Sequence, residues 1–122
     1  MKSLDYYAIK EAASLLEAVS LIKRNGKRTI FVVDDDMSIK GLLSEGDILS
    51  SIMEEVATHI EVQSIMNTNY YFVSDQDRLD LNSLLMYASK GVLLLPVLNG
   101  RSTLVGVVDV IGELIDRINK EG

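Results

Sequence analysis

The sequence predicts a mixed α/β fold (α+β in its element order), with two tandem β-α-β-β-α repeats packed as a pseudo-twofold pair. Three observations carry this prediction. The chain has 122 residues, the length of one domain. A shift of 65 residues aligns its two halves, and both halves show the same order of periodic segments. A unit of about 55 residues is marginal alone, because small domains bury proportionally little surface. We therefore expect the two copies to share a core.

The repeat rests on residues of the same kind at matching positions. Scattered identities arise by chance among common residues, but matched glycines in a single ungapped register do not. We therefore place the first unit at 1–57, a linker at 58–65 and the second unit at 66–122. The identical pairs are Tyr6 and Tyr71, Leu16 and Leu81, Gly26 and Gly91, Val32 and Val97, Gly41 and Gly106, and Leu49 and Leu114.

Local patterns predict the elements of the first unit. Apolar residues recur at helical spacing after Ala12, and Asn25-Gly26 supplies a helix stop. Two β-branched or aliphatic runs flank the turn-forming triplet Asp34-Asp35-Asp36, which predicts a hairpin. In order, we expect a strand at 6–9, a helix at 12–23, strands at 29–33 and 39–43, and a helix from about residue 44.

The second unit repeats this order. Its strands are again short and apolar, and its helices carry apolar residues on one face. We expect a strand at 70–73, a helix at 77–89, strands at 93–98 and 103–108, and a helix at about 110–119.

Composition excludes several classes of function. The chain carries 12 basic and 18 acidic residues, a net charge of −6, which argues against nucleic acid as a partner. It has no cysteine, which excludes disulfides, zinc ribbons and thiol catalysis and fits a cytoplasmic protein. Its one histidine, His59, leaves no histidine cage for a metal, and we expect Asp34-Asp35-Asp36 to form a turn, not a metal site. No apolar run approaches the roughly 18 residues of a membrane span.

Several segments together resemble the cystathionine-β-synthase (CBS) domain pair, also called a Bateman module. They are Ile30-Phe31-Val32-Val33-Asp34, the Gly-apolar-x-Ser-x-x-Asp run from Gly41 to Asp47, Ser64-Ile65-Met66-Asn67, and Leu95-Pro96-Val97-Leu98-Asn99. The resemblance covers nearly the whole chain. It implies a pair of CBS motifs that senses an adenine-containing nucleotide. Gly46-Asp47-Ile48 further resembles CBS pairs attached to sugar-phosphate nucleotidyltransferases and isomerases.

The resemblance implies a ligand site at Ser44 and Asp47, where the third strand turns into a helix. The Asp47 carboxylate would accept hydrogen bonds from both hydroxyls of a ribose, and Ser44 with the helix N-terminus would face phosphate oxygens. A capping box, Ser44 at the cap and Asp47 three residues later, explains the same pair without a ligand. Both interpretations stay open, and they do not exclude each other.

Four further residues are candidates for the same site. Gly41 opens the signature, and Arg28 belongs to a basic cluster with Lys23, Arg24 and Lys27. Arg28 could bind phosphate, whereas cations at a helix C-terminus also complement the helix dipole. The resemblance places Ile9 and Thr29 in the pocket wall, and core packing is the alternative for both.

The second unit departs from the signature. The 65-residue shift puts Asp109 where Ser44 lies and Gly112 where Asp47 lies. A carboxylate would repel phosphate, and glycine offers no side chain for a ribose, although Asp109 could still cap a helix. We expect ligand in the first site only.

The resulting hypothesis is a regulatory, non-catalytic module that binds AMP, ADP, ATP or S-adenosylmethionine and controls an attached or partner enzyme. The alternative is a ligand-free dimerisation or interaction module. An enzyme is disfavoured because lone carboxylates would have no evident catalytic partner. We also expect a homodimer, through apolar helical stripes that include Ile48, Ile52, Leu114, Ile115 and Ile118.

Overall fold

The computed structural model describes residues 3–55 and 57–121, so residues 1, 2, 56 and 122 of the expected units lie outside it. The described chain forms two three-stranded sheets and four α-helices, which confirms the predicted fold class. The first set is β1 (Ala8–Lys10), α1 (Leu15–Asn25), β2 (Thr29–Val33), β3 (Ile39–Ser44) and α2 (Glu45–Met53). The second set is β4 (Val73–Ser74), α3 (Leu81–Ser89), β5 (Leu94–Leu98), β6 (Leu104–Asp109) and α4 (Val110–Glu121).

Both sheets have the same topology and register. In the order β1-β2-β3 the first pair is parallel and the second antiparallel, and β4-β5-β6 repeats this pattern. Thr29 pairs with Ser44 as Leu94 pairs with Asp109, and each hairpin has an irregularity at the same place. The hairpin turns also match, because Met37 and Ser102 both adopt a left-handed φ, of 63° and 61°.

The repeat is not ungapped, contrary to the expectation. Val73 pairs with Val97 as Ile9 pairs with Val32, so the first strands differ by 64 residues. The connection at 75–80 has six residues where 11–14 has four, and α3 is correspondingly two residues shorter than α1. Hydrogen bonds from the Ser74 amide to Asp77 and from the Gln76 amide to the Ser74 hydroxyl organise this longer connection.

The predicted elements are present, with shifted starts. The first strand begins at Ala8 because residues Leu4–Tyr6 form a 3-10 turn. The helix expected from residue 12 begins after Ser14, which caps it by accepting from the Glu17 amide. Likewise α3 begins after its cap Asp80, four residues later than expected, and β4 has two residues only.

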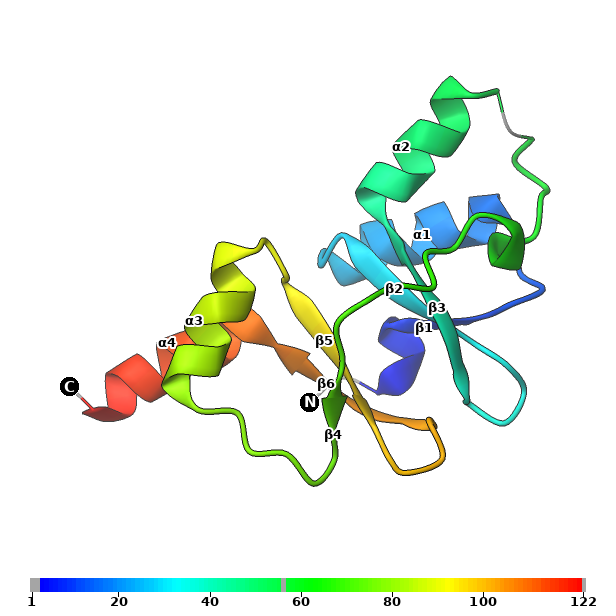
Figure 1. Cartoon of the computed structure of the whole chain (residues 1–122). Helices are drawn as coiled ribbons and strands as arrows, with labels where there is room; N and C mark the ends of the chain where they lie inside the picture. The colour runs from blue at the N-terminus through cyan, green and yellow to red at the C-terminus, as the bar shows by residue number, and fades with distance from the viewer. Residues whose placement is uncertain (1–2, 56, 122) are drawn as a thin grey trace.

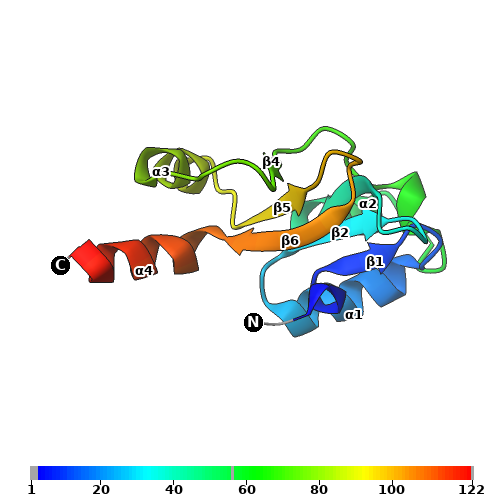
Figure 2. The same cartoon turned by 90° about the horizontal axis from the view of Figure 1, so that it is seen from below.

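The two units share a hydrophobic core. Each has its own cluster between sheet and helices, and a third cluster joins Phe31 and Val33 of the first sheet to Leu94, Leu98 and Leu104 of the second. Burying such a side chain fully contributes about 1.5–3 kcal/mol. Helices α1 and α2 lie at one end of the molecule, α3 and α4 lie at the other, and the sheets lie between them (Figures 1 and 2).

Candidate functional site

A cavity of about 380 Å³ lies between the two units, at the start of α2. This volume falls in the range of about 300–1,000 Å³ typical of small-molecule sites. Both units line it. The first contributes Thr29, Leu42, Ser44 and Asp47. The segment leading to β4 contributes Asn67, Asn69, Tyr70 and Tyr71, and residues 90–94 come from the loop before β5 and the first residue of that strand.

Asp47 is half-buried in this cavity and takes part in a helix cap. One of its oxygens, Oδ2, accepts hydrogen bonds from the Ser44 amide and the Ser44 hydroxyl, both at 2.9 Å. The Ser44 hydroxyl in turn accepts from the Asp47 amide at 3.2 Å. The capping box is therefore formed. Within the described chain no hydrogen bond reaches the second carboxylate oxygen, Oδ1, so the cap leaves an acceptor for a ligand hydroxyl.

The second unit supplies an aromatic wall and a cation. The Tyr71 ring packs edge-on against Tyr87, with ring centroids 5.6 Å apart, and the Lys90 ammonium lies 5.7 Å from the Tyr71 centroid. Lys90 is the one cationic side chain among the described residues that line the cavity. Burial raises the pKa of the neighbouring Tyr70 phenol, which therefore stays neutral at physiological pH. The cavity thus combines a carboxylate, aromatic rings and an ammonium group.

Three of the six predicted residues meet in this cavity. Ser44, Asp47 and Thr29 all line it, because Thr29 begins β2 directly opposite Ser44 at the end of β3. Arg28 lies beside it, on a shallower pocket that also includes Thr29 and Ser44. Its side chain is 72% exposed and approaches Glu45 at 3.8 Å, an ion pair that solvent weakens.

The other two predicted residues lie elsewhere. Gly41 is buried in β3, where an added Cβ would lie 2.7 Å from the Met66 sulfur and 3.0 Å from the Asn67 carbonyl oxygen. The glycine is therefore needed for this close packing and does not line the cavity. Ile9 packs against the core of the first unit and lines a separate pocket near the N-terminal end of α1.

Residues at positions that match the lining of the Asp47 cavity form an internal ion pair. The Lys27 ammonium donates to Asp109 Oδ2 at 2.7 Å, and Asp109 Oδ1 accepts from the Gly112 amide at 3.1 Å, so Asp109 caps α4 as expected. Burial raises the pKa of Asp109, but the hydrogen bonds from Lys27 and Gly112 outweigh it and hold that pKa below its usual value. Lys27 matches Val92 in the 65-residue register, so this pair occupies the counterpart of the Asp47 cavity.

The sequence alone does not indicate the lining residues that come from the opposite side of the cavity, which are Asn67, Asn69, Tyr70, Tyr71 and Lys90. Pseudo-twofold packing places the entry to β4 and the loop before β5 across from the start of α2. The repeat pairs Tyr6 with Tyr71 and so indicates an aromatic residue at this position in both units. No local motif indicates that Tyr71 belongs to a ligand site.

The acidic triplet at residues 34–36 forms a turn, and the described acidic side chains do not gather into a metal site. Asp34 forms the predicted turn: its Oδ1 accepts from the amides of Asp36 and Ser38, and chiefly the Ser38 bond lowers the pKa of Asp34. Across residues 3–55 and 57–121, no cluster of three or more histidine, cysteine, aspartate or glutamate side chains could hold a metal ion.

No helix in the described part of the chain has the length and apolar character needed to cross a membrane.

Residues 1–54 match the family model described as the CBS domain. A curated relative from Thermofilum pendens, an uncharacterized 33.4 kDa protein in a ribosomal RNA operon, is 27% identical over 109 residues. The match covers 89% of this chain and 35% of that protein. The chain thus spans about a third of the length of this relative.

Solved structures share the whole fold. A putative acetoin utilization protein (AcuB) from Vibrio cholerae has a TM-score of 0.79 at 21% identity, covering 99% of this chain and 93% of that one. CBSX2, solved in complex with AMP, has a TM-score of 0.75 at 19% identity, covering 94% and 88%. The CBS domain pair of MJ0100, solved with 5′-methylthioadenosine and S-adenosyl-L-methionine, has a TM-score of 0.71 at 18% identity, covering 94% and 88%.

These similarities agree with the geometry of two sheets, a shared core and a cavity between the units. Residues 1–54 match the family model of the CBS domain, and the described chain shares its fold with the CBS domain pair of MJ0100 and with the AcuB protein.

Proposed function

We propose that this chain is a regulatory module that binds one adenine-containing nucleotide in the cavity between its units. The observation that carries the proposal is the Asp47 carboxylate, held at the start of α2 with Oδ1 unused, across from Tyr71 and Lys90. Two neighbours of the same fold were solved with adenosine compounds, which supports this ligand class. We further propose 1–57 and 66–122 as the two CBS motifs, with 58–65 as their linker.

The chemistry of the cavity matches the parts of such a ligand. The carboxylate accepts from ribose hydroxyls, and hydrogen bonds to a charged group are stronger than neutral ones. Tyr71 offers a flat apolar face for a base, and Lys90 supplies a positive charge for a phosphate or carboxylate. AMP, ADP, ATP and S-adenosylmethionine all carry these parts.

Ligand binding would affect a partner protein by changing the interface between the two units. The cavity includes Leu42 and Leu94, which also belong to the packing shared by the two sheets. A bound ligand would therefore favour one relative placement of the units. The regulated protein we propose is an attached or partner enzyme, of the sugar-phosphate nucleotidyltransferase or isomerase class that Gly46-Asp47-Ile48 resembles.

Self-association is a second function that a specific observation favours. The outer faces of α2 and α4 expose apolar side chains: Leu49, Ile52 and Met53 on α2, and Ile111, Ile115 and Ile118 on α4, each at least 43% accessible. Such apolar surface marks interaction sites. We propose a homodimer through these helices, which would also serve a module that binds no ligand.

A thermal-shift panel tests the ligand proposal. Ligand at about one hundred times its dissociation constant stabilises a one-site protein by about 2.7 kcal/mol, which raises the melting temperature. We expect a shift with at least one of AMP, ADP, ATP and S-adenosylmethionine, and none with ribose-free adenine at the same concentration. No shift with any of the four would favour the ligand-free interaction module instead.

A further inference from the structure

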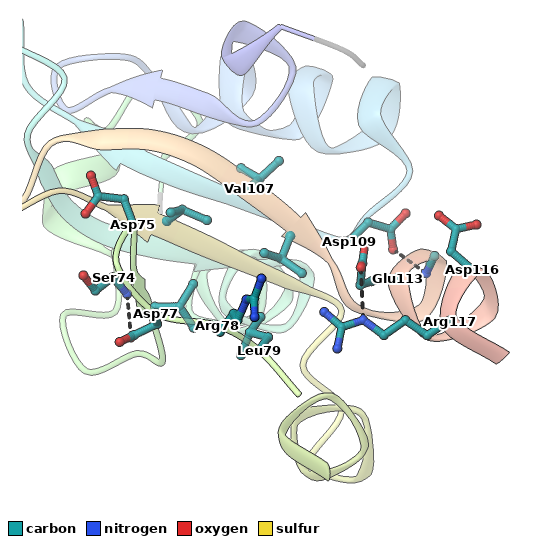
Figure 3. Close-up of a pocket in the computed structure, with 14 residues that line it drawn as sticks. Ser74, Asp75, Asp77, Arg78, Leu79, Val107, Asp109, Glu113, Asp116 and Arg117 are labelled. Atoms are coloured by element: carbon teal, nitrogen blue, oxygen red, sulfur yellow. Dashed lines mark hydrogen bonds and ion pairs between the residues drawn. The ribbon is translucent and has the colours of Figure 1, made fainter. Parts of the chain in front are cut away.

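A groove of about 510 Å³ crosses the outer surface of the second unit. Its floor is formed by Val107 and Val108 of β6. Figure 3 shows side chains from the connection after β4 on one side and from α4 on the other. Asp77, Arg78 and Leu79 belong to the first wall, and Glu113, Asp116 and Arg117 to the second.

The same surface of the first unit is covered by residues 60–66 of the chain itself. The Val62 amide donates to the Ala13 carbonyl at 2.8 Å, and the Leu15 amide donates to the Ile60 carbonyl at 2.9 Å. The Val62 side chain is fully buried in the first core, together with Leu43 and Ile48. This stretch is therefore an extended segment held by main-chain hydrogen bonds, by the fully buried Val62, and by the partly buried Ile60 and Ile65.

The covered surface and the groove correspond element by element. In the 65-residue register, Val108 matches Leu43 and Glu113 matches Ile48, which flank Val62 in the first unit. The connection after β4 stands where the connection after β1 accepts the main chain of residues 60–63. Within residues 3–55 and 57–121, no segment covers the second unit in this way, and the groove is open.

We propose that this groove binds an extended segment of a partner polypeptide, in the manner in which residues 60–66 bind the first unit. The segment would place a β-branched residue where Val62 lies and a basic residue where Glu61 lies. This inference does not depend on the nucleotide proposal, because Asp47 and its cavity lie outside the groove.

The negative charge of the groove favours a basic residue in the bound segment. Glu61 forms a β-bridge with Ser14, the uncharged cap of α1, whereas the corresponding cap of α3 is the carboxylate of Asp80. Asp75 and Asp77 follow β4 on the same wall, and Asp116 belongs to the α4 side of the groove. Arg117 is paired with Glu113 at 3.2 Å and also helps to lower the pKa of Asp80, and Arg78 lies on the first wall. These two cations are outnumbered by the five carboxylates of Asp75, Asp77, Asp80, Glu113 and Asp116. A lysine in the segment would therefore meet a surplus of negative charge.

Two synthetic peptides test the proposal against the full chain. One has the sequence of residues 59–67, and the other has the same sequence with Glu61→Lys. Binding is followed by the fluorescence polarisation of a dye at the peptide N-terminus. We expect saturable binding of the lysine peptide, at least about fivefold tighter than that of the glutamate peptide. Asp116→Lys in the protein should weaken binding of the lysine peptide at least about tenfold, the equivalent of about 1.4 kcal/mol.

The test includes a matched control variant and a measurement that the variants are folded. Asn119→Lys lies exposed on the same helix outside the groove and should leave peptide binding unchanged. Circular dichroism of both variants should match the unaltered chain. Absence of binding at millimolar peptide, or binding that Asp116→Lys leaves intact, would overturn the proposal. Self-association that Asp116→Lys abolishes would also overturn it, since a second copy would then be the occupant.

Discussion

Lys27 and Lys90 give the two clefts different chemistry. The Lys27 ammonium donates to the Asp109 carboxylate at 2.7 Å, so these two groups pair with each other within the protein. Lys90 lies against the Tyr71 ring instead, and Asp47 keeps one oxygen free of protein hydrogen bonds in the described chain. The expectation of one ligand site, based on Asp109 and Gly112, thus gains a further reason in Lys27, which the signature residues do not indicate.

Asp47→Ala should weaken nucleotide binding by about tenfold to a hundredfold. A hydrogen bond to a charged group contributes about 1.5–3 kcal/mol, and about 1.4 kcal/mol corresponds to tenfold. Titration calorimetry measures the loss. Asp47→Asn should give an intermediate affinity, because it keeps the size of the side chain and removes its charge.

Glu17→Ala is the matched control for this variant. Glu17 occupies the same third position of a capping box, with Ser14 at the start of α1, and it lies outside the cavity. Its loss should lower the melting temperature to a similar extent and leave affinity unchanged. Equal affinity losses in both variants would mean that Asp47 acts only through the helix cap.

The Lys27–Asp109 pair should make stability depend on pH. The folded pKa of Asp109 lies below its ordinary value of 3.8, so its contribution is fully present above about pH 4 and is lost as pH falls through the lowered pKa. Lys27→Met should therefore lower the urea midpoint at pH 7, and the difference in midpoint from the unaltered chain should narrow as the pH falls below about 4. Lys23→Met, in the last turn of α1, serves as control. A difference that stays constant with pH would show that the ion pair does not cause it.

At the scale of elements, the dimer face expected on helices α2 and α4 is partly wrong. Ile48 and Leu114 were expected on that face, but they are 6% and 7% exposed and belong to the two unit cores. Ile52, Ile115 and Ile118 do point outward, each more than half exposed. Helical periodicity marks an apolar stripe, but it cannot divide a wide stripe between core and surface.

Ile52→Lys together with Ile115→Lys should prevent dimer formation without unfolding the chain. Both side chains are exposed, so the monomer loses little, whereas a charge in an apolar interface is costly. Light scattering over a concentration series should show a dimer for the unaltered chain and a monomer for the double variant. Val105→Lys, exposed on β6, should remain dimeric. If the unaltered chain stays monomeric at every concentration of the series, the homodimer proposal is wrong.

The boundaries of the elements were predictable where local chemistry sets them. The hairpin strands β2 and β3 flank the acidic turn and begin where expected. The starts of α1 and α3 were missed because their caps, Ser14 and Asp80, end longer connections than the apolar pattern suggests. The strand expected at 70–73 shortens to β4 because Tyr70 and Tyr71 turn toward the cavity lining instead of pairing.

At the scale of the whole molecule, the repeat predicted two units with a common core, and it predicted half of the site. Ser44, Asp47 and Thr29 come from one hairpin and helix start, so a local motif suffices to identify them. Tyr71 and Lys90 reach the same cavity only through the packing of the second unit. No pattern along one unit records which residues of its partner lie opposite, so that half required the structure.

The stoichiometry of nucleotide binding tests the central claim most directly. Calorimetric titration of the full chain with AMP, and with the panel ligand that gives the largest thermal shift, counts sites per chain. The account predicts one site, because Asp47 faces an open cavity while Lys27 and Asp109 occupy its counterpart. Two equivalent sites per chain, or no binding by any ligand of the panel, would contradict it.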